Sequence, residues 1–336
     1  MEIVISYNSP IDVSLWNQLC ELNGNLLQST HYDRLSYYYS KNVFFEVYDS
    51  NKLIAGVKFS IWETRKYKTL TGWFNKTLSQ FGELIIADSA LISKVRPLLI
   101  ESLKKYLQQN NFVCYTVGGY YGNPELLLDL DMQPKETFEF NVAYINLENK
   151  SLEELWDGVH TKHRNVIRKA EKSNCQCYTS TDFSVFYAML KQTYATQDKA
   201  APNEYYLKDM FESMSEYSSI YLADHNGSVL SASLVNFFGS VAYFSFSGTV
   251  KNSLGISNFL QWFIIKDLHN KNSHKYILGQ VAQDEVENDN IKFVVGISKF
   301  KRRFGVEELP SFKKKYVLKK GRNIIWNMIY NRIQKK

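Results

Sequence analysis

Apolar and polar positions alternate with helical spacing between Leu152 and Lys172. The apolar side recurs at intervals of three and four residues and comprises Leu155, Trp156, Val159, Val166, Ile167 and Ala170. Ser151 followed by Glu154 has the spacing of a capping box, which favours a helix start at this point. The opposite side comprises Lys162, Asn165, Arg168, Lys169 and Lys172. The pattern predicts an amphipathic helix whose basic face is either solvated or a contact for an anionic ligand.

A second pattern occurs twice, about 175 residues apart. Phe44–Trp62 and Ser219–Phe238 each contain two apolar strands joined by a turn, D-S-N-K in the first and D-H-N-G in the second. Each hairpin is followed later by a helical pattern and a further strand: RPLLIESLKKYLQQNN leads to FVCYTVGG, and ISNFLQWFIIKDLHNKN leads to KYILGQVA. The repeat predicts an α/β (α+β) protein of two tandem units, each with a mixed central sheet flanked by helices.

The segment Ser228–Val250 lacks charged residues and is long enough to cross a bilayer as a helix. It also contains several serines, and the Gly239-Ser240 pair in its middle has the composition of a turn. Because β-branched and aromatic residues dominate its apolar set, two paired strands are the better prediction. The first residues, MEIVISYNSP, lack a basic start followed by an apolar stretch, so we expect no signal peptide.

Composition and charge narrow the class of protein. The chain has 336 residues, 45% of them hydrophobic and 22% charged, which suits a folded protein with two domain cores. Four scattered cysteines do not suggest a disulfide framework, so we expect a reducing compartment and a cytoplasmic protein. Residues 312–336 carry nine Lys/Arg and no acid, whereas the rest has 31 basic against 34 acidic residues, a net charge of −3. A negatively charged body without a base-reading motif argues against DNA binding.

The basic tail has two interpretations. Phe312–Leu318 has the composition of a closing strand, and the helical pattern after it places Ile325, Trp326, Met328, Ile329, Tyr330 and Ile333 among Asn and basic residues. In the first interpretation this helix packs its apolar side on the first domain. In the second, residues 312–336 make a peripheral contact with the anionic inner face of a membrane.

Four potential zinc ligands lie in or after the basic helix: His160, His163, Cys175 and Cys177. Two histidines separated by two residues and followed by C-x-C do not have the spacing of common finger or ribbon sites. Alternating cysteines are also typical small hydrophobes of a buried strand. No metal site is therefore predicted.

Three segments carry a family resemblance. WDGVHTKHRNVIRKAEKSNCQCY resembles the W-x(n)-K-x-R-N-x-I-R-K-A-E-K-x-G-V-x-V segment of Fem-type transferases, which include peptidoglycan aminoacyl transferases and related envelope-polysaccharide N-acetyltransferases. KYILGQVAQDEVENDNIKFVVGISKFKRRFG resembles the strand-glycine-loop and the F-K-x-x-F-G ending of that family, and LLQSTHYDRLSYY resembles its F-Q-S-x-x-W opening. The resemblance implies two GNAT-type domains: an N-terminal one at 1–140 on the acceptor side, for which 312–336 is a candidate completion, and a catalytic one at 141–311.

The same resemblance implies a donor site in the second domain. After the strand VAYFSFSGT, the segment NSLGIS is similar to a degenerate GNAT pattern Gln/Arg-x-x-Gly-x-Gly/Ala, with Asn252, Gly255 and Ser257 at its marked positions. Unpaired N–H groups at a helix start hold a pyrophosphate well, as an acyl-CoA enzyme requires. The first half has no comparable loop, so catalysis is assigned to the second domain.

The chemistry that the family implies is attack of an acceptor amine on a thioester carbonyl. A backbone N–H of the strand Val241–Gly248 would meet the oxyanion, and Lys301 stands where the family has a lysine implicated in charge stabilisation. The candidate general bases are Asp284, Glu285 and Glu287 in the loop after the strand. The candidate substrate-binding residues are Arg34, Lys162, Arg164 and Arg168.

Departures from the family bear on the substrates. Arg34 stands in place of a lysine that helps the peptidoglycan enzymes to bind a nucleotide-sugar diphosphate, and Ala201 replaces an arginine before Pro202. The chain also lacks a long charged heptad segment for a coiled-coil arm. These features favour an acyl-CoA donor, acetyl-CoA first, and a small-molecule or lipid-linked saccharide acceptor. A tRNA-dependent aminoacyl transferase is the alternative within the family, and a non-catalytic protein that binds anionic ligands or membranes is the alternative of another class.

Overall fold

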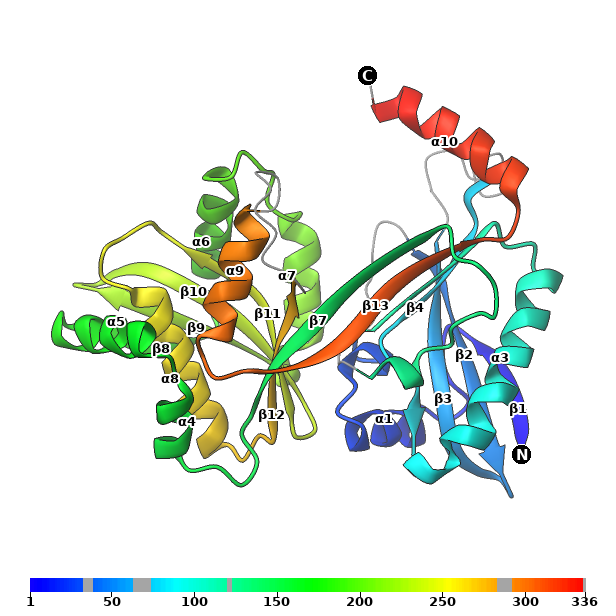
Figure 1. The fold of residues 1–336 in the computed structure, drawn as a ribbon, viewed down its shortest axis with the longest axis horizontal. Helices are drawn as coiled ribbons and strands as arrows, with labels where there is room; N and C mark the ends of the chain where they lie inside the picture. The colour runs from blue at the N-terminus through cyan, green and yellow to red at the C-terminus, as the bar shows by residue number, and fades with distance from the viewer. Residues whose placement is uncertain (33–38, 63–73, 120–122, 283–291, 335–336) are drawn as a thin grey trace. The chain divides into compact units, whose positions relative to one another are not determined.

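The structure is a computed structural model that describes residues 1–32, 39–62, 74–119, 123–282 and 292–334. The chain divides into two compact units (Figure 1). Unit 1 comprises Met1–Phe140 and Pro310–Lys336, and unit 2 comprises Asn141–Leu309.

Unit 1 is a mixed sheet with helices on both faces. Its strands are β1 (Glu2–Tyr7), β2 (Tyr39–Asp49), β3 (Lys52–Trp62), β4 (Thr77–Phe81), β5 (Ile85–Ile86), β6 (Cys114–Gly118) and most of β13 (Glu307–Val317). Its helices are α1 (Val13–Leu22), α3 (Ile92–Gln109) and α10 (Lys320–Gln334), with 3-10 turns at Leu26–Gln28, Ser89–Leu91 and Pro124–Leu126. The strand order is β1-β2-β3-β4-β6-β13, and β5 pairs with β3.

Neighbouring side chains of β2 explain why both faces of this sheet are covered. Phe44 meets Trp16 of α1 edge to face, with ring centroids 5.1 Å apart. Phe45 meets Tyr106 of α3 edge to face at 5.4 Å. Successive side chains of a strand point to opposite faces, so α1 and α3 lie on opposite sides of the sheet.

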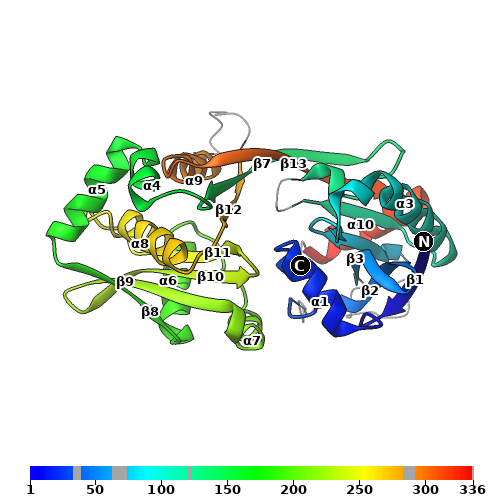
Figure 2. The ribbon, with the colours of Figure 1, turned by 90° about the horizontal axis from the view of Figure 1, so that it is seen from below.

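Unit 2 is built on mixed strands in the order β7-β12-β11-β10-β9-β8. Its strands are β7 (Glu136–Asn146), β8 (Cys175–Ser180), β9 (Ser218–His225), β10 (Ser228–Phe238), β11 (Val241–Thr249) and β12 (Lys275–Val281). Its helices are α4 (Leu152–Gly158), α5 (Thr161–Lys172), α6 (Phe183–Ala195), α7 (Glu204–Ser213), α8 (Ile256–Asn270) and α9 (Lys292–Arg302), with a 3-10 turn at Ser215–Tyr217. In both views α4, α5 and α8 lie together (Figures 1 and 2).

The predicted hairpins are confirmed. β2 and β3 pair around a turn at Ser50 and Asn51, and β9 and β10 pair around Asn226 and Gly227. All four turn residues have positive φ, as the twist of a tight hairpin requires. The uncharged segment Ser228–Val250 forms the antiparallel strands β10 and β11. Across the described ranges, no helix is both long enough and apolar enough to span a membrane.

The single amphipathic helix predicted from Leu152 is wrong in one respect, because the structure has two helices. The capping box is present: Glu154 N donates to Ser151 Oγ at 3.2 Å, and Ser151 N donates to Glu154 Oε2 at 2.7 Å. The chain then turns at Val159, which is buried and extended. His160 caps the start of α5, and its Nδ1 accepts from Lys162 N at 3.1 Å. Burial of Val159 therefore takes precedence over helix continuity.

The prediction of mixed α/β sheets flanked by helices is confirmed in both units. In unit 1, β13 pairs antiparallel with β6 from Lys313 to Val317, so a strand does form in the tail. Each unit has its own apolar core, with the large buried rings Trp16, Tyr115 and Tyr316 in unit 1 and Phe186, Tyr221 and Tyr276 in unit 2.

Candidate active site

The parallel strands β11 and β12 pair over only part of their length. Their pairing joins Val241–Tyr243 to Lys275–Ile277, although β11 continues to Thr249 and β12 to Val281. Each strand shifts its register against its outer neighbour just beyond that point. Bulges bend a strand, and here they coincide with the end of the pairing. Among the described residues no strand joins these two facing edges beyond this point, so a ligand with amide and carbonyl groups can pair there.

In unit 1, by contrast, the parallel strands β4 and β6 are paired along their whole length. β4 and β6 pair from Thr77 to Phe81 and from Cys114 to Gly118, the full length of both strands. Just past the pair, Gly82 N donates to Gly118 O at 3.0 Å. Unit 2 alone therefore offers an open parallel edge within the described parts of the two sheets.

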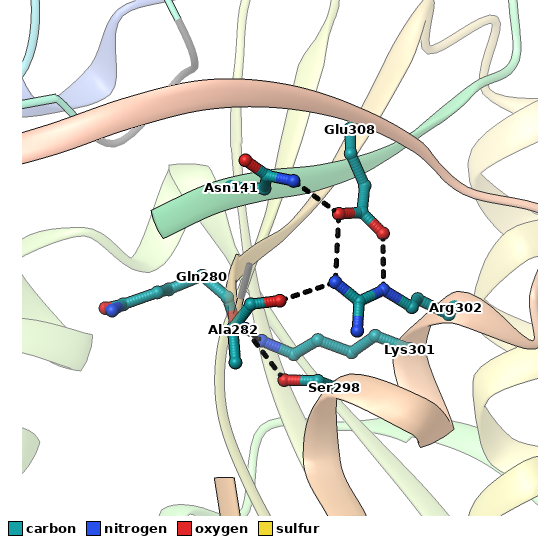
Figure 3. A network of polar contacts seen from close by, with 7 residues as sticks. All are labelled: Asn141, Gln280, Ala282, Ser298, Lys301, Arg302 and Glu308. Carbon is teal, nitrogen blue, oxygen red and sulfur yellow. Dashed lines mark hydrogen bonds and ion pairs between the residues drawn. The ribbon is translucent and has the colours of Figure 1, made fainter. Parts of the chain in front are cut away.

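Lys301 of α9 reaches β12 beside this opening (Figure 3). Its Nζ donates to Gln280 O at 3.0 Å and lies 3.8 Å from the position that a Cβ of Gly279 would take. Gly279 has φ of 82° at the bulge, a conformation that glycine adopts without strain. Burial lowers the pKa of Lys301 to about 8. The structure thus places a cation that loses its proton readily close to the open strand edge.

A polar network fixes the end of β12 to α9 and β13 (Figure 3). Arg302 donates from Nε to Glu308 Oε1 at 2.6 Å, and from Nη2 to Glu308 Oε2 at 3.1 Å and to Ala282 O at 2.5 Å. Asn141 Nδ2 donates to Glu308 Oε2 at 2.8 Å, and Ala282 N donates to Ser298 Oγ at 3.0 Å. The hydrogen bond from Arg302 is the main reason that the pKa of Glu308 is lowered. Arg302, fixed by its bidentate pair with Glu308, holds Ala282 O, and Ser298 holds Ala282 N, so α9 engages both backbone groups of Ala282.

The loop before α8 is held by its own side chains and by α5. Asn252 Nδ2 donates to Val250 O at 2.7 Å, and Asn252 Oδ1 accepts from Leu254 N at 3.0 Å. Lys169 Nζ donates to Ser253 O at 2.8 Å. The Asn252 side chain therefore shapes the loop, and a direct ligand contact by that side chain would compete with these bonds.

Gly255 caps α8 in a tightly packed position. It has φ of 74°, and a Cβ there would lie only 1.9 Å from Val166 Cγ1 of α5. Both the backbone conformation and the contact exclude larger residues. The glycine predicted from a ligand pattern thus has a structural reason of its own. Ser257, in the first turn of α8, is partly exposed beside it.

The basic face of α5 is exposed, and two of its predicted binding residues already have partners. Arg164 Nη1 pairs with Asp157 Oδ1 at 2.9 Å. The Arg168 guanidinium lies over the Trp156 ring, 5.4 Å from its centroid. Lys162 is exposed to solvent. The predicted substrate-binding residues Lys162, Arg164 and Arg168 therefore share one helix, and only Arg164 has its charge in an ion pair with a nearby carboxylate of the described residues.

The four candidate zinc ligands do not form a cluster. His163 is buried against Phe300 and Phe304, and its Nε2 lies 3.1 Å from Phe300 O. Burial lowers the pKa of His163 to about 4, so the ring is neutral at pH 7. Cys175 is buried in β8 as predicted for a small hydrophobe. In the described ranges, His, Cys, Asp and Glu form no group of three or more that could hold a metal ion.

Known proteins were compared with the chain by sequence and by structure. No protein-family model matches, and no curated protein matches by sequence. Solved structures do match along almost the whole chain. FemX has a TM-score of 0.71 at 13% identity, covering 96% of this chain and 98% of its own. L-PGS from Bacillus licheniformis has 0.55 at 12% identity, covering 98% of each chain. A tandem GNAT protein from the clavulanic acid biosynthesis pathway has 0.52 at 10% identity, covering 94% and 98%.

The chain has the tandem GNAT fold of the Fem type. This confirms the fold that the three sequence segments implied. In this tandem GNAT fold, the segments behind the resemblance also meet in space: His160 N of the first donates to Arg303 O of the second at 2.8 Å. Gln28 and Ser29 of the N-terminal segment are fully buried in unit 1.

Three predicted residues lie outside the described residues: Arg34, Asp284 and Glu285, as does the further candidate base Glu287. The sequence analysis did not identify the network of Arg302, Ser298 and Glu308, because it links residues of different elements and no local pattern marks them. The signal that could have pointed to β12 was Gly279, an isolated glycine within an apolar strand pattern, which often marks a bulge.

Proposed function

We propose that the protein is an N-acyltransferase whose unit 2 binds the acyl donor between β11 and β12. The observation that carries the proposal is the parallel pair that opens after Tyr243 and Ile277, next to the Lys301 ammonium. Acyl-CoA, with acetyl-CoA first, is the proposed donor. The proposed acceptor is an amine of an amino sugar or a related envelope precursor, either a small molecule or a lipid-linked saccharide.

The reaction needs one bond to form and one to break. The acceptor nitrogen attacks the thioester carbonyl carbon, the C–N bond forms, and the C–S bond breaks. The thiolate takes up a proton and the new amide nitrogen loses one. A backbone N–H at the open edge of β11 donates to the carbonyl oxygen as negative charge develops there. Lys301, charged below its pKa of about 8, stabilises charge in the same place or on the leaving sulfur.

The anionic part of the donor would lie at the start of α8. The first N–H groups of a helix lack helical partners and favour anions, and Ser257 lies in this first turn. Lys169 of α5 donates to Ser253 O in the loop before α8, and Lys162 lies exposed on α5. These lysines would attract a pyrophosphate as point charges, without the bidentate hydrogen bonds that an arginine forms.

A second donor, an aminoacyl-tRNA, is favoured by two specific observations. FemX and L-PGS, both at TM-scores above 0.5, share the fold along nearly the full chain. Val166 also packs against Gly255, which narrows the space over the loop. In this alternative the same strand opening receives the aminoacyl ester, and the exposed cations of α5 meet tRNA phosphates.

The test is calorimetric titration of the intact protein with acetyl-CoA and, in parallel, with an uncharged tRNA pool. Ser257→Glu places a negative charge in the first turn of α8, where it suits the helix dipole and should leave the fold intact. We expect it to weaken acetyl-CoA binding at least tenfold, while Ser257→Gln, of similar size, has a much smaller effect. Saturable tRNA binding without acetyl-CoA binding would establish the second donor. Unchanged acetyl-CoA affinity in Ser257→Glu would refute the proposed donor position.

A further inference from the structure

The C-terminal helix α10 presents apolar side chains to solvent. Ile324, Ile325 and Met328 are 53%, 44% and 63% exposed. At 100° per residue these three positions fall within one arc of the helix, and exposed Lys320 lies at its edge. Asn323, which is buried, faces the other way. An apolar arc of this kind is unusual on a surface that water covers at all times.

Three contacts anchor the beginning of this helix to unit 1. Leu318 N and Lys319 N both donate to Val113 O, at 2.8 and 3.3 Å. Cys114 Sγ donates to Asn323 Oδ1 at 3.6 Å. Figure 1 shows α10 set apart from α1 and α3 of the same unit. The first turn is thus anchored, and the exposed arc extends beyond that anchor.

The positive charge around this arc indicates an anionic partner. Residues 312–336 contain nine Lys/Arg and no acid, while the rest of the chain has a net charge of −3. Several of these lysines are engaged within unit 1: Lys314 pairs with Asp129, Lys315 pairs with Glu136, and Lys319 Nζ donates to Asn111 Oδ1. A second copy of the chain would bring one basic helix against another, which costs repulsion. An anionic apolar surface satisfies both the charge and the exposed side chains.

We propose that α10 binds the surface of a membrane rich in anionic lipid, with Ile324, Ile325 and Met328 inserted at the headgroup level. Such a helix lies in the interface with its apolar side down and its cations among the headgroups. The length of α10 and its cations suit this position, and the inference does not depend on the proposed acyltransfer. If the acceptor is lipid-linked, the contact also brings the protein to its substrate.

The test is vesicle flotation of the intact protein with phosphatidylcholine alone and with phosphatidylcholine containing phosphatidylglycerol. We expect binding to the anionic vesicles, release by high salt, and at least tenfold weaker binding to neutral ones. Ile324→Ser with Met328→Ser should reduce anionic binding at least tenfold. Lys320→Gln should reduce it about fivefold, equivalent to about 1 kcal/mol.

The matched control is Ile11→Ser with Leu22→Ser, which removes two apolar side chains of unit 1 that are 61% and 71% exposed. This variant should bind vesicles as the unaltered protein does. Equal binding by both double variants, or no preference for anionic vesicles, would overturn the proposal. A concentration-dependent dimer in sedimentation that only the α10 double variant abolishes would show that a second copy covers the arc, which would also overturn it.

Discussion

At the scale of single residues, Lys301 lies in an environment unlike that of an exposed lysine. Its side chain is partly buried, its ammonium has the Gln280 carbonyl as acceptor, and burial lowers its pKa to about 8. A lysine in solution would keep its proton to pH 10 or above. The group therefore combines a positive charge at neutral pH with a low free energy of deprotonation.

The first prediction concerns catalysis by this residue. Lys301→Met should lower kcat by a factor of about 30–10³, equivalent to about 2–4 kcal/mol of transition-state stabilisation, with little change in donor Kd. In the unaltered protein, kcat should fall as pH rises through about 8, because the ammonium is then lost. Steady-state kinetics from pH 6 to 10 test this. Unaltered kcat in Lys301→Met, or the same alkaline decline in that variant, would exclude the role.

The second prediction concerns stability at the same residue. Burial depresses the folded-state pKa of Lys301, so below pH 8 the folded protein carries the cost of a desolvated charge. Between pH 8 and 10.5 the unfolded chain binds more protons, and this cost disappears as pH rises. Lys301→Met should therefore raise the free energy of unfolding at pH 7 by about 1–2 kcal/mol, after allowing for the lost hydrogen bond. Urea denaturation should show a smaller gain at pH 10, and a loss of stability at pH 7 would contradict the burial argument.

At the scale of elements, the end of β12 depends on α9 and β13. Glu308 accepts from Arg302 and Asn141, and Arg302 in turn holds Ala282 O. Because Lys301 and Arg302 are neighbours on α9, the network also fixes where the Lys301 side chain begins. We therefore expect the Arg302–Glu308 pair to position Lys301 and the end of β12 without contacting the reacting groups itself.

The third prediction tests this positioning. Glu308→Gln removes the charge that pairs with Arg302 but keeps the size of the side chain, so kcat should fall about tenfold, while donor Kd stays nearly constant. The free energy of unfolding should fall by about 1–3 kcal/mol, because Arg302 loses a charged partner. Glu307→Gln is the matched control, since the neighbouring Glu307 binds Tyr144 and Lys150 on the surface. An equal loss of kcat in both variants would mean that the network has no specific effect on the site.

Local elements could be predicted from the sequence, and long-range pairings could not. The hairpin turns at Asn51 and Gly227 and the Ser151 cap are set by residues close in sequence. The break at Val159 depends on burial, and the contact of Lys301 with Gln280 joins residues 21 positions apart on different elements. The spacing of apolar residues along the sequence does not indicate contacts between distant elements. Lys301 was identified only because its motif resembles a family, whereas Arg302 beside it gave no separate signal.

At the scale of the whole molecule, the two units share a fold but differ at one parallel strand pair. In unit 1 the pair β4–β6 is closed along its full length, and in unit 2 the pair β11–β12 opens after three residues. In the closed pair, the backbone N–H and C=O groups of the two strands bond to each other, so they are not available to a ligand bound at the strand edge. This difference supports the proposed donor site in unit 2, and it is compatible with the proposed membrane contact of α10 in unit 1.

The last prediction follows from this difference. Saturating donor should slow amide hydrogen exchange at least fivefold in peptides covering Phe244–Thr249 of β11 and the first turn of α8, because bound carbonyl and phosphate oxygens would accept from those N–H groups. Exchange in Thr77–Phe81 of β4 should not change, since these amides belong to a closed pair. Mass spectrometry of the intact protein with and without acetyl-CoA, and separately with tRNA, measures both regions together. Protection of β4 and its following loop without protection of β11 would place the donor in unit 1, and the open strand pair would then have lost its proposed role.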